Sequence, residues 1–323
     1  MHPGVPARRT SAAHGCGSAP VSDRLPQGAS RTKRTVTVVR SDDFPAWLLG
    51  LVDDAAAFPP ASAPLDRAVA DHERHRSAAY APLLGGFAIS DVKVPDLIDV
   101  LDHRDADEVL AVNVVVTGGA GAIAPAVRWA ARAPHLDLRS VELALRGEDL
   151  AQNAQRVLAA LGDIEEDLTD VPIYVELPRW QDGPPRSWLT ALDELAAGNL
   201  RAKFRTGGAH PYDVPEPEDL AACIEAALDR ELPFRCTGGL GGAVVTTDPT
   251  AGHGFLNVLL ATRASLDGED VVGALQNPSA ADLVAGADPD ALARARRWFT
   301  GFGSADVLDA YDELVGVGLV TPG

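Results

Sequence analysis

The sequence predicts an α/β fold, a (β/α)8 TIM barrel with a C-terminal helical extension. First, short apolar runs alternate with longer amphipathic stretches from about residue 36 onward, over about the length that a barrel of this kind needs. Second, these runs are apolar on both faces, which is typical of parallel strands buried between helices. Third, polar residues recur where the runs end, and in a barrel these strand ends converge on one mouth.

Eight apolar runs are the candidate strands, at residues 36–39, 48–54, 83–89, 110–116, 140–145, 172–177, 202–205 and 233–237. Helical patterns lie between them, at residues 65–80, 94–101, 122–133, 147–161, 185–197 and 217–229. The last of these opens with PEPEDL, whose early acidic residues suit a helix N-terminus.

The position of the eighth strand of the ring, which closes the barrel, is also open to two later stretches: HGFLNVLLAT at 253–262, which fits a strand or a helix, and DVVGAL at 270–275, which fits less well. We expect the barrel to occupy residues 35–285. Residues 286–323, with DPDALARARRWFTGFG and SADVLDAYDELVGVGLV, are predicted to form helices that pack on the barrel or make a homodimer contact. Residues 1–34 are rich in Pro, Gly, Ser and Arg and are expected to form a disordered extension.

A doubly wound dinucleotide fold is the alternative architecture. No Gly-x-Gly-x-x-Gly motif follows the first strand, as that fold requires. The nearest stretch, TGGAGA at 117–122, has the wrong spacing. We therefore favour the barrel and expect no cofactor.

Composition narrows the partners and the compartment. The net charge of −18 argues against nucleic acid and anionic membranes, whose phosphates need a basic patch. Cys16, Cys223 and Cys236 form no Cys-x-x-Cys pair, which indicates neither a disulfide framework nor a zinc site. No apolar stretch approaches the roughly 20 residues that span a bilayer, and none follows Arg8-Arg9 as in a signal peptide. A cytoplasmic protein is expected.

Lys203 is one of only three lysines and lies in the short run AKFRTGG. Side chains alternate along a strand, so Lys203 and Arg205 share one face and Phe204 takes the other. If that face is the barrel interior, burial and the neighbouring guanidinium should lower the pKa of Lys203. A neutral amine could then form a Schiff base with an aldehyde or ketone. The alternative is a lysine that extends from the strand end to solvent.

A second phrase, FRCTGGLGG, repeats Thr-Gly-Gly one strand-helix unit later. Backbone N–H groups in such turns can cradle a phosphate, and Arg205 or Arg235 could add a bidentate clamp. The alternative is that both phrases are tight turns leaving their strands. The candidate substrate-binding turn residues are Thr206, Gly207, Gly208, Gly238 and Gly239.

Four acidic residues and one amide near strand ends are candidates for proton transfer or orientation. Asp53 and Asp54 follow an apolar run, and one of them could be a general acid/base, a metal ligand or a cap. Glu176 and Glu142 lie in apolar strands and must be paired if buried. We expect Glu176 to hold Lys203 or Arg205, or to shuttle protons. Glu142 should lie within reach, with Asn113 as a polar orienter.

The histidines give weaker signals. His72 and His75 in DHERH are predicted to lie on a solvated helix face. His210 and His253 lie in loops near the expected mouth, where either could act as an acid or base. No pair has the spacing of a zinc motif.

AKFRTGG…PFRCTGGLGG resembles the class I deoxyribose-phosphate aldolase group, in which a Lys-x-x-Thr-Gly strand carries the Schiff-base lysine and a Lys-x-x-Gly-Gly strand tunes it. The resemblance implies that Lys203 forms the imine and that Arg235 replaces the second lysine. Gly238 and Gly239 would then lie in the phosphate-binding turn. A guanidinium supplies charge but shuttles no protons. The whole chain is also similar to a bacterial (β/α)8 barrel group that carries LVDDAAAFPP and HGFLN; that likeness implies no activity.

Three functions fit these observations. The leading one is an aldolase-type lyase that acts on a small anionic, phosphorylated or otherwise charged carbonyl compound, with Lys203 as nucleophile and Glu176 or Asp54 moving protons. The second is a non-covalent isomerase or metal-assisted enzyme that uses the strand-end carboxylates. The third is a barrel that has lost catalysis and serves as a binding or scaffold subunit.

Overall fold

The computed structural model describes residues 44–103, 109–180, 183–208, 213–246 and 252–322. All described residues belong to one compact unit. The predicted disordered extension at 1–34 and the predicted strand at 36–39 lie outside the described residues.

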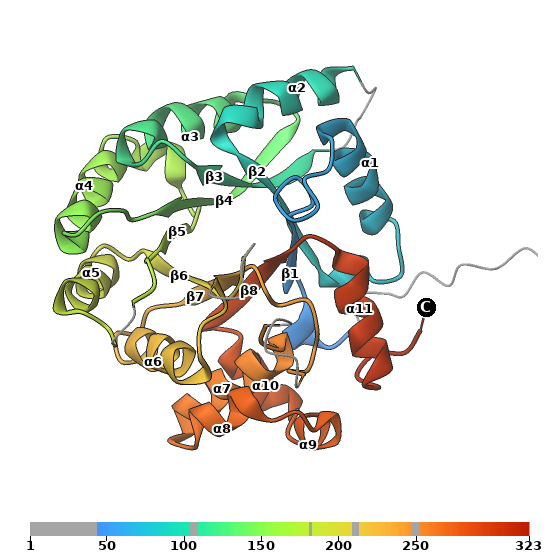
Figure 1. The fold of residues 1–323 in the computed structure, drawn as a ribbon. Helices are drawn as coiled ribbons and strands as arrows, with labels where there is room; N and C mark the ends of the chain where they lie inside the picture. Colours follow the sequence, from blue (N-terminus) through green and yellow to red (C-terminus); the bar gives the residue numbers. More distant parts are fainter. Residues whose placement is uncertain (1–43, 104–108, 181–182, 209–212, 247–251, 323) are drawn as a thin grey trace, which may run out of the picture. The chain divides into compact units, whose positions relative to one another are not determined.

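The described residues form a closed barrel of eight parallel strands in the order β1 to β8, with β8 paired to β1. This confirms the predicted (β/α)8 barrel. Figure 1 shows the strands as a ring with helices around it. The strands are β1 (Val52–Asp54), β2 (Leu84–Ser90), β3 (Leu110–Val116), β4 (Leu136–Ala144), β5 (Ile173–Glu176), β6 (Arg201–Arg205), β7 (Phe234–Thr237) and β8 (Phe299–Ser304).

Helices follow the strands and cover the outside of the barrel (Figure 1). They are α1 (Leu65–Arg76), α2 (Val94–Asp102), α3 (Ile123–Arg132), α4 (Leu150–Gly162), α5 (Arg186–Ala197), α6 (Pro217–Leu228), α7 (Phe255–Asp267), α8 (Val271–Gln276), α9 (Ala280–Ala285), α10 (Pro289–Ala295) and α11 (Val307–Gly316). Short 3-10 helices occupy Ala46–Leu48, Ala81–Leu83, Asp91–Lys93, Ala120–Ala122 and Glu165–Leu168. The buried residues of α3, at Ile123, Ala126, Val127 and Ala130, show the spacing that turns one helical face to a core.

The main core lies between the strands and the helices. The outward-facing aromatic rings of three neighbouring strands form a continuous row: Phe204 lies 5.4 Å from Phe234, which lies 5.6 Å from Phe299. Trp188 of α5 stacks on Phe204 from the helix layer. Because Phe204 packs outward, its neighbour Lys203 must face the barrel interior.

The predicted position of the closing strand was wrong. HGFLNVLLAT belongs to α7, which is buried along most of its length, and DVVGAL forms α8. The closing strand is β8, FTGFGS, inside the segment expected to be a terminal helix. The barrel therefore extends past residue 285 to residue 304, and of the described elements only α11 follows it.

Glycine explains why β8 is hard to identify from its sequence. A Cβ at Gly301 would lie 2.7 Å from the carbonyl oxygen of Leu51, so only glycine allows β8 to approach β1 this closely. The strand consequently lacks the apolar run that marks the other strands.

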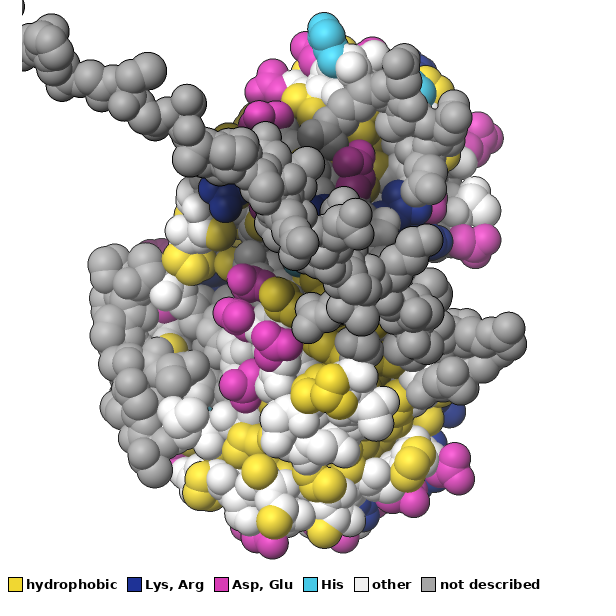
Figure 2. Space-filling model, turned by 90° about the vertical axis from the view of Figure 1, so that its right-hand side faces the viewer, with side chains coloured by type: hydrophobic (Ala, Val, Ile, Leu, Met, Phe, Trp, Pro, Cys, Tyr) yellow, Lys and Arg dark blue, Asp and Glu magenta, His cyan; other side chains and the backbone are white. Residues whose placement is uncertain are grey.

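The described surface is mixed. On the face drawn in Figure 2, acidic side chains gather among apolar ones and basic side chains are sparse. In the described part of the chain, no helix has both the length and the apolar character needed to cross a bilayer.

Candidate active site in the barrel interior

Lys203 lies in the middle of β6, and its side chain is only 8% exposed. Its Nζ lies 2.7 Å from Oε2 of Glu142 and 3.2 Å from Oε2 of Glu176. Strand pairing sets these contacts, because Glu176 of β5 is in register with Lys203. Arg205, two residues on, donates from Nε to Oε1 of Glu176 at 2.9 Å. The structure thus brings together the two glutamates and the lysine that the sequence placed near one another.

Arg235 of β7 extends the same network toward the other side of the ring. It is in register with Lys203 and donates from Nη1 to Oε1 of Glu142 at 2.5 Å. Its Nη2 pairs with Asp53 of β1, and the Asp53 carboxylate also accepts the N–H of Gly86 at 2.8 Å. Arg235, suggested from the sequence as a bidentate substrate clamp, is therefore a buried bridge between two carboxylates.

Charge balance follows from this arrangement. The interior carboxylates belong to Asp53, Glu142 and Glu176, and the cations that meet them belong to Lys203, Arg205 and Arg235. Each buried carboxylate has a hydrogen-bonded cation, which a buried charge requires. We refer to these six residues as the interior ion chain.

The expected lowering of the Lys203 pKa was wrong. Burial does disfavour the ammonium form, but the carboxylates of Glu142 and Glu176 outweigh burial and raise the pKa of Lys203 above its ordinary value. Burial likewise raises the pKa of Glu176, yet Lys203 and Arg205 outweigh it and the pKa of Glu176 is lowered. Arg205, the guanidinium expected to lower this pKa, pairs with Glu176, and Arg235 pairs with Glu142; each of these glutamates also pairs with Lys203.

Exposure within the interior ion chain increases toward the C-terminal ends of the strands. The Arg235 side chain is 6% exposed and Glu176 is 13% exposed, whereas Arg205 is 44% exposed. Because active sites of such barrels lie at this end, the face formed by Glu176 and Arg205 is the one that a substrate would meet.

The two Thr-Gly-Gly phrases recur because their turns pack on each other. Arg205 pairs with Thr237, so β6 and β7 end side by side. The Thr206 hydroxyl donates to the carbonyl oxygen of Gly238, and a Cβ at Gly207 would lie 2.6 Å from Cα of Gly239. Glycine at these positions therefore allows the backbones of the two turns to lie close together. Thr206 is fully buried with its hydroxyl committed to this contact, which removes it from the candidate substrate contacts.

Gly239→Ala should therefore destabilise the protein. Gly239 has φ +66°, and a Cβ there would collide with the carbonyl oxygen of Thr206 and lie 2.8 Å from Cα of Gly207. We therefore expect a loss of more than about 1 kcal/mol of unfolding free energy. The matched control is Gly121→Ala, where a Cβ meets nothing within 4 Å. Urea denaturation of both variants checks this, and an equal effect at the two positions would contradict it.

Asp54 faces away from the barrel interior. Its Oδ2 lies 3.0 Å from Nδ1 of His72 of α1, and both side chains are 1% exposed. Its Oδ1 accepts the N–H of Ala56 at 3.0 Å. The proposal of Asp54 as an acid or base at the mouth was therefore wrong, as was the solvated position of His72. The sequence carried a signal, because His72 shares a helical face with the buried Ala68.

Two other predicted positions differ from expectation. Asn113 pairs with Ser140, whereas Glu142 pairs with Val115 two residues farther along β3. Asn113 thus lies one inward layer below the glutamates, and its Oδ1 accepts from the Ser140 hydroxyl at 2.8 Å.

His253 is buried, with Nε2 2.9 Å from the carbonyl oxygen of Pro215, and burial lowers its pKa. His210 lies outside the described residues. Gly208 leaves no room for a Cβ beside Asp213.

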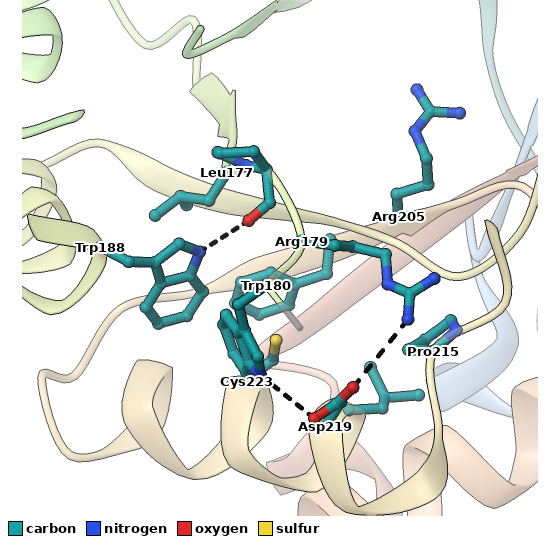
Figure 3. A pocket seen from close by; sticks show the side chains of 11 residues that line it. Leu177, Arg179, Trp180, Trp188, Arg205, Pro215, Asp219 and Cys223 are labelled. Carbon is teal, nitrogen blue, oxygen red and sulfur yellow. Dashed lines mark hydrogen bonds and ion pairs between the residues drawn. The ribbon is translucent and has the colours of Figure 1, made fainter. Parts of the chain in front are cut away.

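A small crevice lies outside the ring, between the C-terminal ends of β5 and β6 and helices α5 and α6 (Figure 3). Its volume is about 20 Å3, enough for about one water molecule. The Trp188 and Trp180 rings line it, and the Trp180 Nε1 donates to Asp219. Burial raises the pKa of the Cys223 thiol in its lining well above the ordinary value, which disfavours the reactive thiolate form. Figure 3 shows Arg205 extending away from these rings.

The described residues contain no preformed cluster of metal ligands. None of their His, Cys, Asp and Glu side chains form a group of three or more arranged to hold a metal ion. The carboxylates suggested as ligands are Asp53, Asp54, Glu142 and Glu176, and each already pairs with a basic side chain.

Comparison with known proteins adds little to this geometry. No family model matches the chain, and no curated protein matches it. A solved structure described as "a putative fructose-1,6-biphosphate aldolase from Coccidioides immitis" is 8% identical, with a TM-score of 0.37, covering 84% of this chain and 96% of that chain. A likeness this distant carries no argument about activity. The chain's own strand pairing therefore establishes the barrel, and the side chains inside the ring are the basis for its chemistry.

Proposed function

We propose that the protein is an aldolase-type lyase that binds a small anionic carbonyl compound and forms a Schiff base with Lys203. The observation that carries this is the interior ammonium group of Lys203 with carboxylate oxygens at 2.7 and 3.2 Å. An amine nucleophile needs a group that takes its proton, and these carboxylates are within hydrogen-bond reach.

The reaction proceeds through ordinary imine chemistry. A proton passes from Nζ to a glutamate, the neutral amine attacks the carbonyl carbon, and water leaves to give the iminium ion. The bond between the α-carbon and the β-carbon of the iminium ion then breaks, and its electron pair stays with the α-carbon to form an enamine. A glutamate takes the proton of the β-hydroxyl group, and the β-carbon fragment leaves as an aldehyde. Protonation of the enamine carbon and addition of water release the second product and restore Lys203.

Arg205 is the residue best suited to hold the anionic group of the substrate. Its side chain is 44% exposed and uses Nε and Nη2 to contact one oxygen of Glu176. This leaves N–H groups that can form charge-assisted hydrogen bonds to a carboxylate or phosphate. Binding an anion there would weaken the hold of Arg205 on Glu176 and make that carboxylate a better proton acceptor.

Reductive trapping tests the imine. The protein is treated with sodium cyanoborohydride and a panel of small phosphorylated and carboxylated aldehydes and ketones, and peptides are mapped by mass spectrometry. We expect one adduct on Lys203, absent from the Lys203→Arg variant. Because the pKa of Lys203 is raised, the neutral amine should increase about tenfold per pH unit, so trapping should accelerate continuously from pH 7 to pH 9. A plateau near pH 7, or adducts confined to other lysines, would contradict the proposal.

The raised pKa also favours a second candidate function. A lysine held as an ammonium ion can stabilise a developing enolate while Glu176 or Glu142 moves the proton, which is isomerase chemistry without a covalent step. In that case Lys203→Arg should retain activity and Glu176→Gln should lose it. A lyase that uses the imine should lose activity in both variants.

A further inference from the structure

A cavity of about 290 Å3 opens at the N-terminal end of the barrel, opposite the end where Arg205 is exposed. Most residues that line it lie before or near the start of their strands: Leu84 is the first residue of β2 and Thr300 the second of β8. The lining residues that matter most here are Asp53, Gly86, Ala111, Asn113, Arg139 and Tyr174. A water molecule needs only about 10–15 Å3, so the cavity has room for a solute of several heavy atoms.

Small residues keep this end of the barrel hollow. Such barrels normally fill their interior with layers of bulky apolar side chains. Here a Cβ at Gly86 would lie 2.7 Å from Nδ2 of Asn113, and a Cβ at Gly85 would collide with the Asp53 carboxylate. Ala111 contributes only a methyl group. The glycines thus make space for two polar side chains, and the resulting cavity is polar.

The polar groups left without a partner here are hydrogen-bond donors. Asn113 uses Oδ1 to accept from Ser140, and within the described residues its Nδ2 has no partner. Both Asp53 oxygens are already engaged, by Arg235 and by the N–H of Gly86. Arg139 lies at the rim, with its side chain 63% exposed; its Nε lies 3.1 Å from Oδ2 of Asp137, which leaves its Nη groups as donors.

A further cation, Arg201, lies next to the cavity lining at this end of the barrel. Arg201, the first residue of β6, donates to the Tyr174 hydroxyl at 2.9 Å and lies over the Tyr174 ring. Among the described carboxylates, none lies within 4.0 Å of the Arg201 guanidinium. Donors and an uncompensated guanidinium together favour a ligand that brings oxygen acceptors and negative charge.

We propose that this cavity binds a small oxyanion through a carboxylate or phosphate group. The ligand would accept hydrogen bonds from the Asn113 amide and the Arg139 guanidinium, close to the Tyr174 ring. The site is separate from the face on which the Schiff base would form, although Arg235 and Asp53 border both. Binding therefore needs no turnover and no imine.

Isothermal titration calorimetry of the full chain tests this with malonate, inorganic phosphate and uncharged malonamide. We expect saturable binding of at least one anion, and at least tenfold weaker binding of malonamide. Arg139→Gln should weaken anion binding at least tenfold. Arg128→Gln is the matched control, because Arg128 is also an exposed arginine paired with an aspartate, Asp167, and should bind as the wild type does.

A second variant separates binding from folding. Ala111→Leu fills the cavity without removing a charge and should also abolish binding, with circular dichroism showing that the fold is retained. Lys203→Arg should bind the anion normally even though it cannot form an imine, so failure of the proposed reaction and failure of this site are distinguishable. Equal binding by the Arg139 and Arg128 variants, or no saturable binding of either anion, would overturn the proposal.

Discussion

Lys203→Met is expected to lower the free energy of unfolding by about 3–5 kcal/mol, the usual cost of removing one partner from a buried ion pair. Methionine fills similar space but leaves the carboxylates of Glu142 and Glu176 without the ammonium group that lies within 3.2 Å of both. Glu142 keeps Arg235 and Glu176 keeps Arg205, which limits the loss. Chemical denaturation at pH 7 measures the effect.

The matched variant is Lys203→Arg, which keeps the positive charge and can donate to both glutamates. We expect it to recover most of the stability lost in Lys203→Met. It should form no adduct when it is treated with a carbonyl compound and cyanoborohydride. The comparison separates the structural role of the charge from the chemical role of the amine. Equal stability of the methionine variant and the wild type would show that Lys203 does not lie inside the ring.

The Lys203 contribution also has a pH window. Because its pKa is raised in the folded state, the stabilisation is fully present below the ordinary lysine pKa of 10.5 and is lost as pH rises through the folded value. Glu176 behaves in the opposite way: its pKa is lowered from 4.5, so its stabilisation is present above that pH and is lost as pH falls through the folded value. The stability of Lys203→Met should therefore approach that of the wild type at high pH.

Arg235→Met should have an effect of similar size, about 3–5 kcal/mol, because it leaves Asp53 and Glu142 as buried carboxylates with one cation fewer. Asp53 would retain only the N–H of Gly86 as a donor. Adding Asp53→Asn to Arg235→Met should restore part of the loss, since it removes the unpaired charge. A double-mutant cycle measured by chemical denaturation gives this coupling.

Arg230→Met is the surface control for Arg235→Met. Arg230 pairs with Asp193, whose side chain is 59% exposed, and such pairs contribute about 0–1 kcal/mol. Additive effects of Arg235→Met and Asp53→Asn, with no coupling, would contradict the interior ion chain.

Much of the fold follows from local sequence pattern. Strands such as β3 coincide with the predicted run at 110–116, and α5 with the pattern at 185–197, because a buried strand and an amphipathic helix differ in period. β8 escaped prediction because its glycines serve a backbone contact with β1 and not a pattern of burial. Helix α7 is apolar on both faces because further helices pack on its outer side. Those helices cannot be inferred from the sequence of α7 alone.

The candidate site, like the fold, was only partly predictable from local sequence. Alternation along β6 correctly suggested that Lys203 and Arg205 share a face, but only strand register shows that Glu142 bridges Lys203 and Arg235. That bridge reverses the expected direction of the Lys203 pKa. The choice between Asp53 and Asp54 also depends on register, since adjacent residues face opposite sides of the sheet. The N-terminal cavity is lined by residues from seven segments, so the sequence of any single segment does not predict it.

Direct titration of Lys203 tests the central claim, that an ammonium group lies inside the barrel between two glutamates. The chain has only three lysines, so protein labelled with 13C at the lysine ε-carbon gives a simple NMR spectrum in which Lys203→Arg identifies one signal. We predict that this signal titrates above the ordinary pKa of 10.5. A midpoint at or below that value would contradict the account, because it would mean that the amine meets solvent or cations and not carboxylates.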